Sequence, residues 1–258
     1  MTARRHFIVS LVVALAACGG SSPAPTRQEK RVDPKADPTA GESGGEEESD
    51  GSFPLHGKIE LRPLADDSEF ARGLAEGKTS EGIRARLDPP PRAGGREEVV
   101  LEADDLSTLH RWVSGFKDQI PKNLRVAYEK TAPLAKPTLA EPMHKGWRLH
   151  FVQSDEGFEV KEATGRLQLA KLTARPEVRV DLTKADGERF ADLSGRFVGR
   201  KLAFLHDNEL LSAPVVNEKI SGGALIITLA GDDEEARTLV AKLAKMPLSK
   251  VVLPKASD

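Results

Sequence analysis

The sequence predicts an α+β protein, in which short strands alternate with amphipathic helices. The strand signal is the alternation of apolar and charged residues, as in 58–64, where Ile59 and Leu61 have charged neighbours. The helix signal is a series of apolar residues at steps of three and four, as in the run 106–120. Because both patterns recur after residue 55, we expect sheets covered by helices.

The first eighteen residues combine a charged start, an apolar run and a cysteine. Arg4 and Arg5 precede an apolar run over 7–17, and the only cysteine, Cys18, follows directly. An ordinary secretory signal shares the charged start and the apolar run of ~7–15 residues. A cysteine at the cleavage position, however, supplies the thiol that a diacylglycerol anchor needs. We therefore expect residues 1–17 to be a signal peptide and Cys18 to be the lipidation site.

The segment 18–52 reads as a spacer between that anchor and the folded body. It is rich in Pro, Gly and Ser, carries the acidic cluster 46–50, and has almost nothing apolar to bury, so we expect disorder. A docking tail is the alternative interpretation. Gly19 resembles the residue that follows the cysteine in lipoproteins sent to the outer membrane. The expected location is the cell envelope, facing the periplasm and anchored to the outer rather than the inner membrane.

Composition narrows the classes of partner. With 38 basic and 40 acidic side chains the formal net charge is −2. The chain therefore lacks the excess of positive charge that is typical of nucleic-acid-binding proteins. No cysteine besides Cys18 is present, so burial of apolar side chains must stabilise the body.

The first structured part is expected over 53–130, as a small strand–helix–strand subdomain. Asp104 and Asp105 open its longest predicted helix, and Pro121 stops it. The prolines and the absence of a periodic core over 131–143 indicate a linker. The predicted elements are strands at 58–64, 97–103 and 124–130 and helices at 68–77 and 106–120.

The second part, 144–258, combines more strands with two helices. Thr183 is expected to cap the first helix together with Asp186, because both can serve free amides in the first turn. Asp207 and Asn208 suit a hairpin turn because both tolerate positive φ. The predicted strands are 147–152, 158–163, 166–172, 177–182, 201–206 and 224–229, and the second helix follows Asp232. One shared core is expected to contain Phe190, Leu193, Phe197, Leu202, Phe204, Ile226, Leu239, Val240 and Leu243.

The run Val198–Gly223, VGRKLAFLHDNELLSAPVVNEKISGG, resembles the head subdomain of the first periplasmic domain of SecD, the membrane-embedded accessory of the Sec translocon. The order of VGR, an apolar strand, Asp with a turn residue, SAP and GG carries the resemblance. It continues into DDEEARTLVAKL and KMPLSKVVL. The resemblance implies a ferredoxin-like α/β sandwich, with helices on one face of a mixed or antiparallel sheet.

The family couples proton flow to polypeptide release through membrane helices, and this sequence has no comparable apolar segment, so the motor function does not transfer. In the family the first periplasmic domain is thought to hold emerging polypeptide. The resemblance therefore implies a non-enzymatic lipoprotein that binds extended or unfolded polypeptide and assists export near the Sec translocon. The alternative is a structural adaptor that docks a folded envelope protein, unrelated to export.

The expected binding feature is the segment Ser212, Ala213, Pro214, Val215 and Val216, which we call the rim. A proline cannot donate to a strand ladder, so the rim should lie at an edge that could receive an extended chain by strand addition. A purely structural corner is the alternative. Structural turns are expected at Gly199, Gly222 and Gly223.

No catalytic residue, cofactor or metal site is expected. The six histidines lack metal-binding spacing, and His144 and His150 read as surface groups. His206 and Asp207 lie near Ser212 in the sequence, but no nucleophile elbow surrounds that serine.

Overall fold

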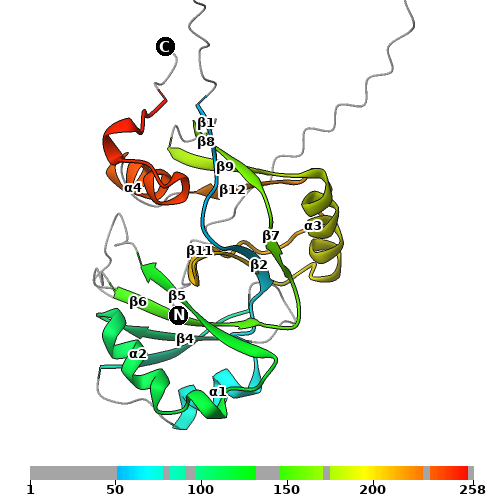
Figure 1. Ribbon diagram of the computed structural model, residues 1–258. Helices are drawn as coiled ribbons and strands as arrows, with labels where there is room; N and C mark the ends of the chain where they lie inside the picture. The colour runs from blue at the N-terminus through cyan, green and yellow to red at the C-terminus, as the bar shows by residue number, and fades with distance from the viewer. Residues whose placement is uncertain are drawn as a thin grey trace, which may run out of the picture. The chain divides into compact units, whose positions relative to one another are not determined.

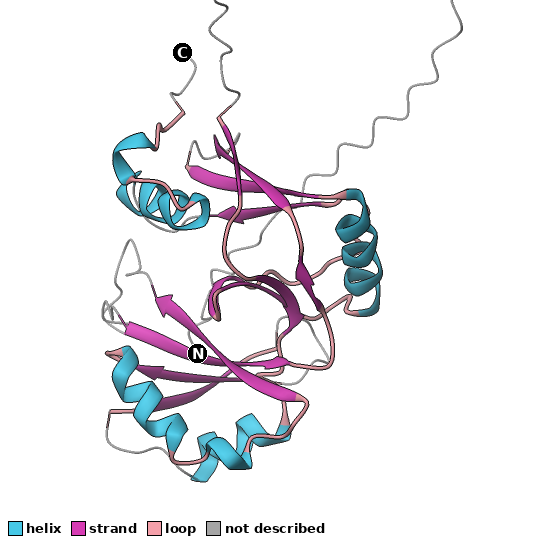
Figure 2. Cartoon of the chain, viewed as in Figure 1, coloured by secondary structure: helices cyan, strands magenta, loops and turns pink. Residues whose placement is uncertain are grey.

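The computed structural model describes residues 51–77, 82–90, 97–131, 146–170, 175–228 and 233–254. Strands and helices alternate along these residues, which confirms the α+β class (Figures 1 and 2). Cys18 and the expected signal peptide lie outside the described residues, as do Asp232, His144 and nearly all of the two expected linkers. The predictions for those segments stay predictions.

One sheet has four antiparallel strands in the order β1-β8-β9-β12. Val178 and Val180 of β9 point to one face because they are two residues apart. They share a hydrophobic cluster with Phe190 of α3 and Val240 of α4. Both helices therefore cover the same face, as the sequence predicted. The elements are β1 Ser52–Pro54, β8 Ala163–Leu169, β9 Pro176–Leu182, β12 Ala224–Thr228, α3 Lys184–Arg196, α4 Asp233–Ala244 and the 3-10 turn Leu248–Lys250.

The other sheet has eight strands in the order β3-β4-β6-β5-β11-β10-β2-β7. Leu149 and Phe151 of β6 pack in a second cluster with Leu74 of α1 and Leu109 of α2. The elements are β2 Ile59–Pro63, β3 Arg84–Asp88, β4 Glu98–Ala103, β5 Leu124–Thr131, β6 Gly146–Gln153, β7 Phe158–Val160, β10 Leu202–His206, β11 Glu209–Ser212, α1 Glu69–Gly77, α2 Leu106–Ser114 and the 3-10 turn Lys117–Gln119.

Part of the eight-stranded sheet closes on itself. Beyond the end of β2, Leu64 forms a bridge with Val152 of β6, and the Ala65 N–H donates to the Phe151 carbonyl at 2.7 Å. Strands β6, β5, β11, β10 and β2 thus form a closed ring. Its interior holds a third, small apolar cluster of Leu64, Ala127, Val152, Ala203, Leu205 and Leu210.

The strands do not follow the boundary expected at 131–143. β2 lies before that segment but pairs with β10, which lies after it. β5 and β6 lie on opposite sides of the segment and pair with each other along their length. The described residues belong to one unit, Gly51–Asp258, whose sheets both draw strands from each side of the expected linker.

The predicted core is confirmed with one correction. Eight of the nine predicted residues lie in or against the first cluster, but Ile226 does not and Ile227 does. Ile227 pairs with the buried Val178, whereas Ile226 pairs with Arg179 on the opposite face of the sheet. In a strand, adjacent residues point to opposite faces, but in an apolar run such as ALIIT no polar residue marks which face is outward. The sequence therefore could not tell which isoleucine faces inward.

Two of the predicted helix caps lie in the described residues, and one of them acts differently from the prediction. Asp105 accepts from the Thr108 N–H at 2.8 Å, and Thr183 accepts from the Asp186 N–H at 3.3 Å. The buried Asp186 carboxylate does not return to the cap; it accepts from the Lys161 N–H at 2.8 Å instead. The long helix predicted from 106 ends at Ser114, because Gly115 follows and the chain continues into a 3-10 turn.

Candidate functional site

The rim follows a tight hairpin. β10 and β11 are joined by Asp207 and Asn208, whose φ angles of 49° and 68° are both positive, as predicted for this turn. A register shift after Leu205 then turns the outgoing chain, so that Ser212 pairs with Phe204. The hairpin thus places the rim next to the segment that precedes β10.

The inner side of the rim is paired. The Leu202 N–H donates to the Pro214 carbonyl at 3.1 Å, and the Val216 N–H donates to the Arg200 carbonyl at 2.9 Å. Val215 forms an isolated bridge with Lys201 between these two bonds. Pro214 therefore serves as an acceptor only, which is compatible with its missing N–H.

The outer side of the rim carries free backbone groups. In antiparallel pairing alternate residues turn their N–H and C=O away from the partner, so those of Ala213 and Val215 face outward. Neither has a backbone hydrogen bond to another described residue. Ser212 to Val215 are half-buried, whereas Val216 is only 2% exposed and belongs to the first core cluster. Val216 is thus a core residue and not part of an accessible surface, contrary to expectation.

The predicted turn glycines differ in what they do. Gly199 and Gly223 have φ of +89° and +63°, where a side chain is strained, but Gly222 has no such angle and faces open space. The Gly223 carbonyl accepts from the Leu182 N–H at 2.8 Å. A Cβ on Gly187 of α3 would lie 3.1 Å from the Gly223 Cα, so this glycine pair lets the helix approach the turn closely.

His206 is a structural group. Its side chain is 2% exposed, and its Nε2 donates to the His56 carbonyl at 2.7 Å. Its Nδ1 lies 3.6 Å from Asp207 and has no hydrogen-bond partner among the described residues. His206 makes no hydrogen bond to Ser212, so these side chains form no nucleophile–base pair.

His150 lies at one end of the strand ring, and its side chain is only 13% exposed, which corrects the expectation of a surface group. Its Nδ1 lies 2.7 Å from Asp66 and its Nε2 lies 3.0 Å from Glu129. Burial opposes the charged ring, but the charges and hydrogen bonds of the two carboxylates raise the pKa of His150 to about 9. The imidazolium donates through both nitrogens and therefore has no lone pair to act as a base.

A second charged group lies at the other end of the ring. The Glu60 side chain is 1% exposed and accepts from Arg62 at 2.9 Å and from Arg125 at 2.6 Å, with Lys58 at 3.3 Å. Burial alone would raise the pKa of Glu60, but the hydrogen bonds and charges of Arg125 and Arg62 lower it below its usual value. Ion pairs thus close both ends of the apolar ring interior.

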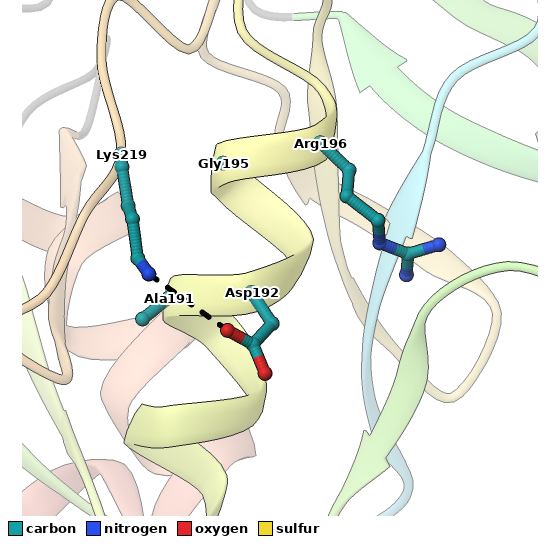
Figure 3. A pocket seen from close by; sticks show the side chains of 5 residues that line it. All are labelled: Ala191, Asp192, Gly195, Arg196 and Lys219. Carbon is teal, nitrogen blue, oxygen red and sulfur yellow. Dashed lines mark ion pairs between the residues drawn. The ribbon is translucent and has the colours of Figure 1, made fainter.

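A hollow of about 570 Å³ lies on α3 and is lined by Ala191, Asp192, Gly195, Arg196 and Lys219. Figure 3 shows Lys219 and Asp192 directed toward each other, at 3.8 Å, while Arg196 points away. Arg196 pairs with Glu156 at 2.7 Å. The hollow is formed by solvated side chains and brings no reactive groups together.

Within the described part of the chain, no three or more His, Cys, Asp or Glu side chains are arranged to hold a metal ion. No helix in the same residues has the length and apolar character needed to cross a bilayer.

Residues 150–249 match a family model described as "SecDF, P1 head subdomain". This region is SecD-like. The match spans the rim, α3, β10 and α4, and it leaves β2 outside, although β2 pairs with β10 in the same sheet.

Curated relatives agree with this match. The SecD protein translocase subunit of Desulfurispirillum indicum is 41% identical over 67% of this chain and 38% of the relative. The SecDF subunit of Thermus thermophilus is 29% identical over 72% of this chain and 27% of the relative. The chain thus spans well under half the length of these SecD-like relatives. A solved structure titled "Structure and function of a membrane component SecDF that enhances protein export" aligns with a TM-score of 0.31 at 18% identity, covering 74% of this chain and 94% of that one.

Proposed function

We propose that this protein binds extended or unfolded polypeptide through its SecD-like region and assists protein export. The supporting observation is the coincidence of the match over 150–249 with the outward backbone groups of Ala213 and Val215. The relatives that match are named as protein translocase subunits. Backbone groups can pair with any extended chain, so such an edge suits a partner that varies in sequence.

Cys18 belongs to the same proposal. A lipid on this residue would keep the SecD-like region at a membrane without a spanning helix, and the spacer 18–52 would separate the region from the lipid surface. The support is the LAAC sequence that follows the apolar run 7–17. No nucleotide, metal or enzymatic step enters the proposal, because pairing of backbone groups needs none.

The deciding experiment is site-specific photocrosslinking from Val215 in cells, followed by identification of the captured chains. We expect adducts with several unrelated exported proteins, captured before they fold. A matched crosslinker at Glu159, an exposed position on β7, should capture few of them.

A binding assay provides the matching test in solution. Val215→Asp puts a charge beside the outward backbone groups and should weaken binding of several unfolded substrates, whereas Val252→Asp, at an 83% exposed position, should not. Binding at the rim should be weak and tolerant of salt, because neutral backbone groups supply it. The proposal fails if Val215→Asp remains folded and binds as well as the parent.

Docking of a folded envelope protein is the second candidate. It is favoured by the exposed apolar side chains of Leu248 and Val252, which are 50% and 83% exposed near the end of the described chain. In the crosslinking experiment this function would appear as a single folded partner, captured from Leu248 rather than from Val215.

A further inference from the structure

A second strand edge lies in the eight-stranded sheet, on β5. The first half of β5 pairs only with β6, since its contact with β11 is a single parallel pair between Tyr128 and Glu209. The Tyr128 N–H donates to the Asn208 carbonyl at 3.3 Å, so the β10–β11 hairpin begins beside Tyr128. Among the described residues, no strand pairs with the stretch from Leu124 to Val126 on that side.

The pairing with β6 fixes which groups face this open side. Val126 lies opposite Phe151. The Phe151 N–H donates to Asp66 at 2.7 Å, and its carbonyl accepts from Ala65, both on the side away from β5. The pair is therefore of the kind that exchanges no hydrogen bonds, and Val126 turns its own N–H and C=O away from β6. Neither group has a backbone partner among the described residues.

A groove of about 470 Å³ runs along this edge, between β5 and the end of α2. Its apolar lining comes from Val113, Ile120, Leu124 and Val126, and the ring of His110 closes it against Tyr128 at 4.6 Å between centroids. An apolar groove beside a free strand edge has the two features that strand addition uses. The edge supplies hydrogen bonds, and the groove takes every second side chain.

In the part of the chain that the structure describes, the charged side chains that line the groove are all basic. Lys117 and Lys122 are exposed and form no ion pair with another described residue. Among the described residues, no Asp or Glu lines the groove; the nearest in sequence, Asp118, lies outside the lining. The third cation, Arg125, points to the opposite face of β5 and pairs with Glu60. The two lysine ammonium groups therefore remain available to an anionic ligand.

We propose that the groove between α2 and β5 binds an extended acidic peptide segment, in which apolar side chains alternate with Asp or Glu. The peptide adds a strand to β5 at Val126, places its apolar side chains against Val113 and Ile120, and pairs its carboxylates with Lys117 and Lys122. The site differs from the rim in position and in selectivity, and it does not depend on the function proposed for the rim.

The test uses the full-length chain and fluorescently labelled peptides with blocked ends, followed by fluorescence anisotropy. The probe alternates Val and Glu; its counterpart has Lys in place of Glu. We expect the acidic peptide to bind more tightly than the basic one, with affinity that falls as salt rises. Lys117→Glu with Lys122→Glu should weaken binding of the acidic peptide about tenfold and strengthen that of the basic peptide.

The matched control reverses two exposed lysines that do not line the groove, Lys130 and Lys250, with the same change in net charge. It should alter binding less than twofold. Equal binding of both peptides, or an equal effect of the two double variants, overturns the proposal, because net charge alone would then explain the result.

Hydrogen exchange locates the peptide and separates this site from the rim. Strand addition should slow exchange of the Val126 amide, and a peptide with alternate N-methylated residues should not slow it. Binding that is lost in Val215→Asp but kept in the Lys117/Lys122 variant would overturn this inference and leave the proposed function standing. The reverse pattern would support this inference and leave the rim without a role in binding this peptide.

Discussion

Arg125 donates to the Glu60 carboxylate at 2.6 Å across the interior of the strand ring, from β5 to β2, two strands that do not pair with each other. This ion pair connects two strands that are not neighbours in the sheet. Because Glu60 also accepts from Arg62, the loss of its charge would leave cations facing one another in a region with little access to water.

Glu60→Gln should therefore be strongly destabilising. Removing one member of a buried ion pair leaves uncompensated charge, and we expect a loss of about 3 kcal/mol in the free energy of unfolding. Urea denaturation provides the measurement. Glu159→Gln, at the exposed position opposite Glu60 on β7, should change the value by less than about 0.5 kcal/mol. If the two variants had similar urea denaturation midpoints, the ion pair between Arg125 and Glu60 would not contribute to the stability of the fold.

His150 should make stability depend on alkaline pH. Its pKa is about 9 in the folded protein against 6.5 for an ordinary histidine, so folding favours the protonated ring. The stabilisation is fully present below about pH 6.5 and is lost as pH rises through 9. The loss amounts to a free energy of unfolding on the order of 3 kcal/mol. Denaturation from pH 6 to 10 should show this decline in the parent. His150→Gln should be less stable at pH 7, with a flatter profile, and parallel profiles would contradict the assignment.

Phe204→Ala should remove one of the largest fully buried side chains of the first core cluster. The side chain is 2% exposed, and truncation of such a residue costs about 3–5 kcal/mol. Ile226→Ala is the matched control, since Ile226 lies on the polar face of its sheet and should cost about 1 kcal/mol or less. If Ile226→Ala proved as costly as Phe204→Ala, the strand register described here would be wrong.

Gly222 and Gly223 should respond differently to alanine. Gly223→Ala forces a side chain into a left-handed conformation beside Gly187 and should cost about 1 kcal/mol or more. Gly222→Ala meets open space and should be nearly neutral. Thermal unfolding of the two variants is enough to compare them, and equal melting temperatures would argue against the close contact between α3 and the turn.

Cys18→Ser should release the protein from membranes into the soluble envelope fraction, because the lipid-bearing thiol would be absent. Fractionation of cells that produce the parent and the variant measures this directly. Mass spectrometry of the parent should find a mature chain that begins at Cys18 with an attached diacylglycerol. Unchanged fractionation of Cys18→Ser would contradict the anchor.

Local features were predictable because a few neighbouring residues determine them. Asp207 and Asn208 suit a turn with two positive φ angles, and Thr183 and Asp105 suit helix caps, so the sequence alone predicted each. The division into core and surface could be predicted where apolar and charged residues alternate, as in β9, where Val178 and Val180 are buried and Arg179 lies on the opposite face. It failed at Ile226, where the run is apolar on both sides.

Distant pairings could not be predicted. His150 lies between Leu149 and Phe151 in a strand and looks like an outward-facing group, and its partner Asp66 is 84 residues away. Closure of the ring through Leu64 and Val152 likewise depends on two segments that share no pattern. The free edge at Val126 emerged only from the register of β5 against β6, because sequence carries no mark of which amides face away from a neighbouring strand.

The pairing of β2 with β10 also sets an order of events during folding. Lys58 and Asp207, at the ends of these strands, hydrogen-bond over a separation of 149 residues. Strand β2 is synthesised before both of its neighbours, β7 at Phe158–Val160 and β10 at Leu202–His206. Contacts this distant in sequence slow folding, and in the newly made chain the edge of β2 that pairs with β10 stays open until residue 206 has been added. A fragment starting at residue 144 would lack β2 altogether and leave one side of β10 without a partner.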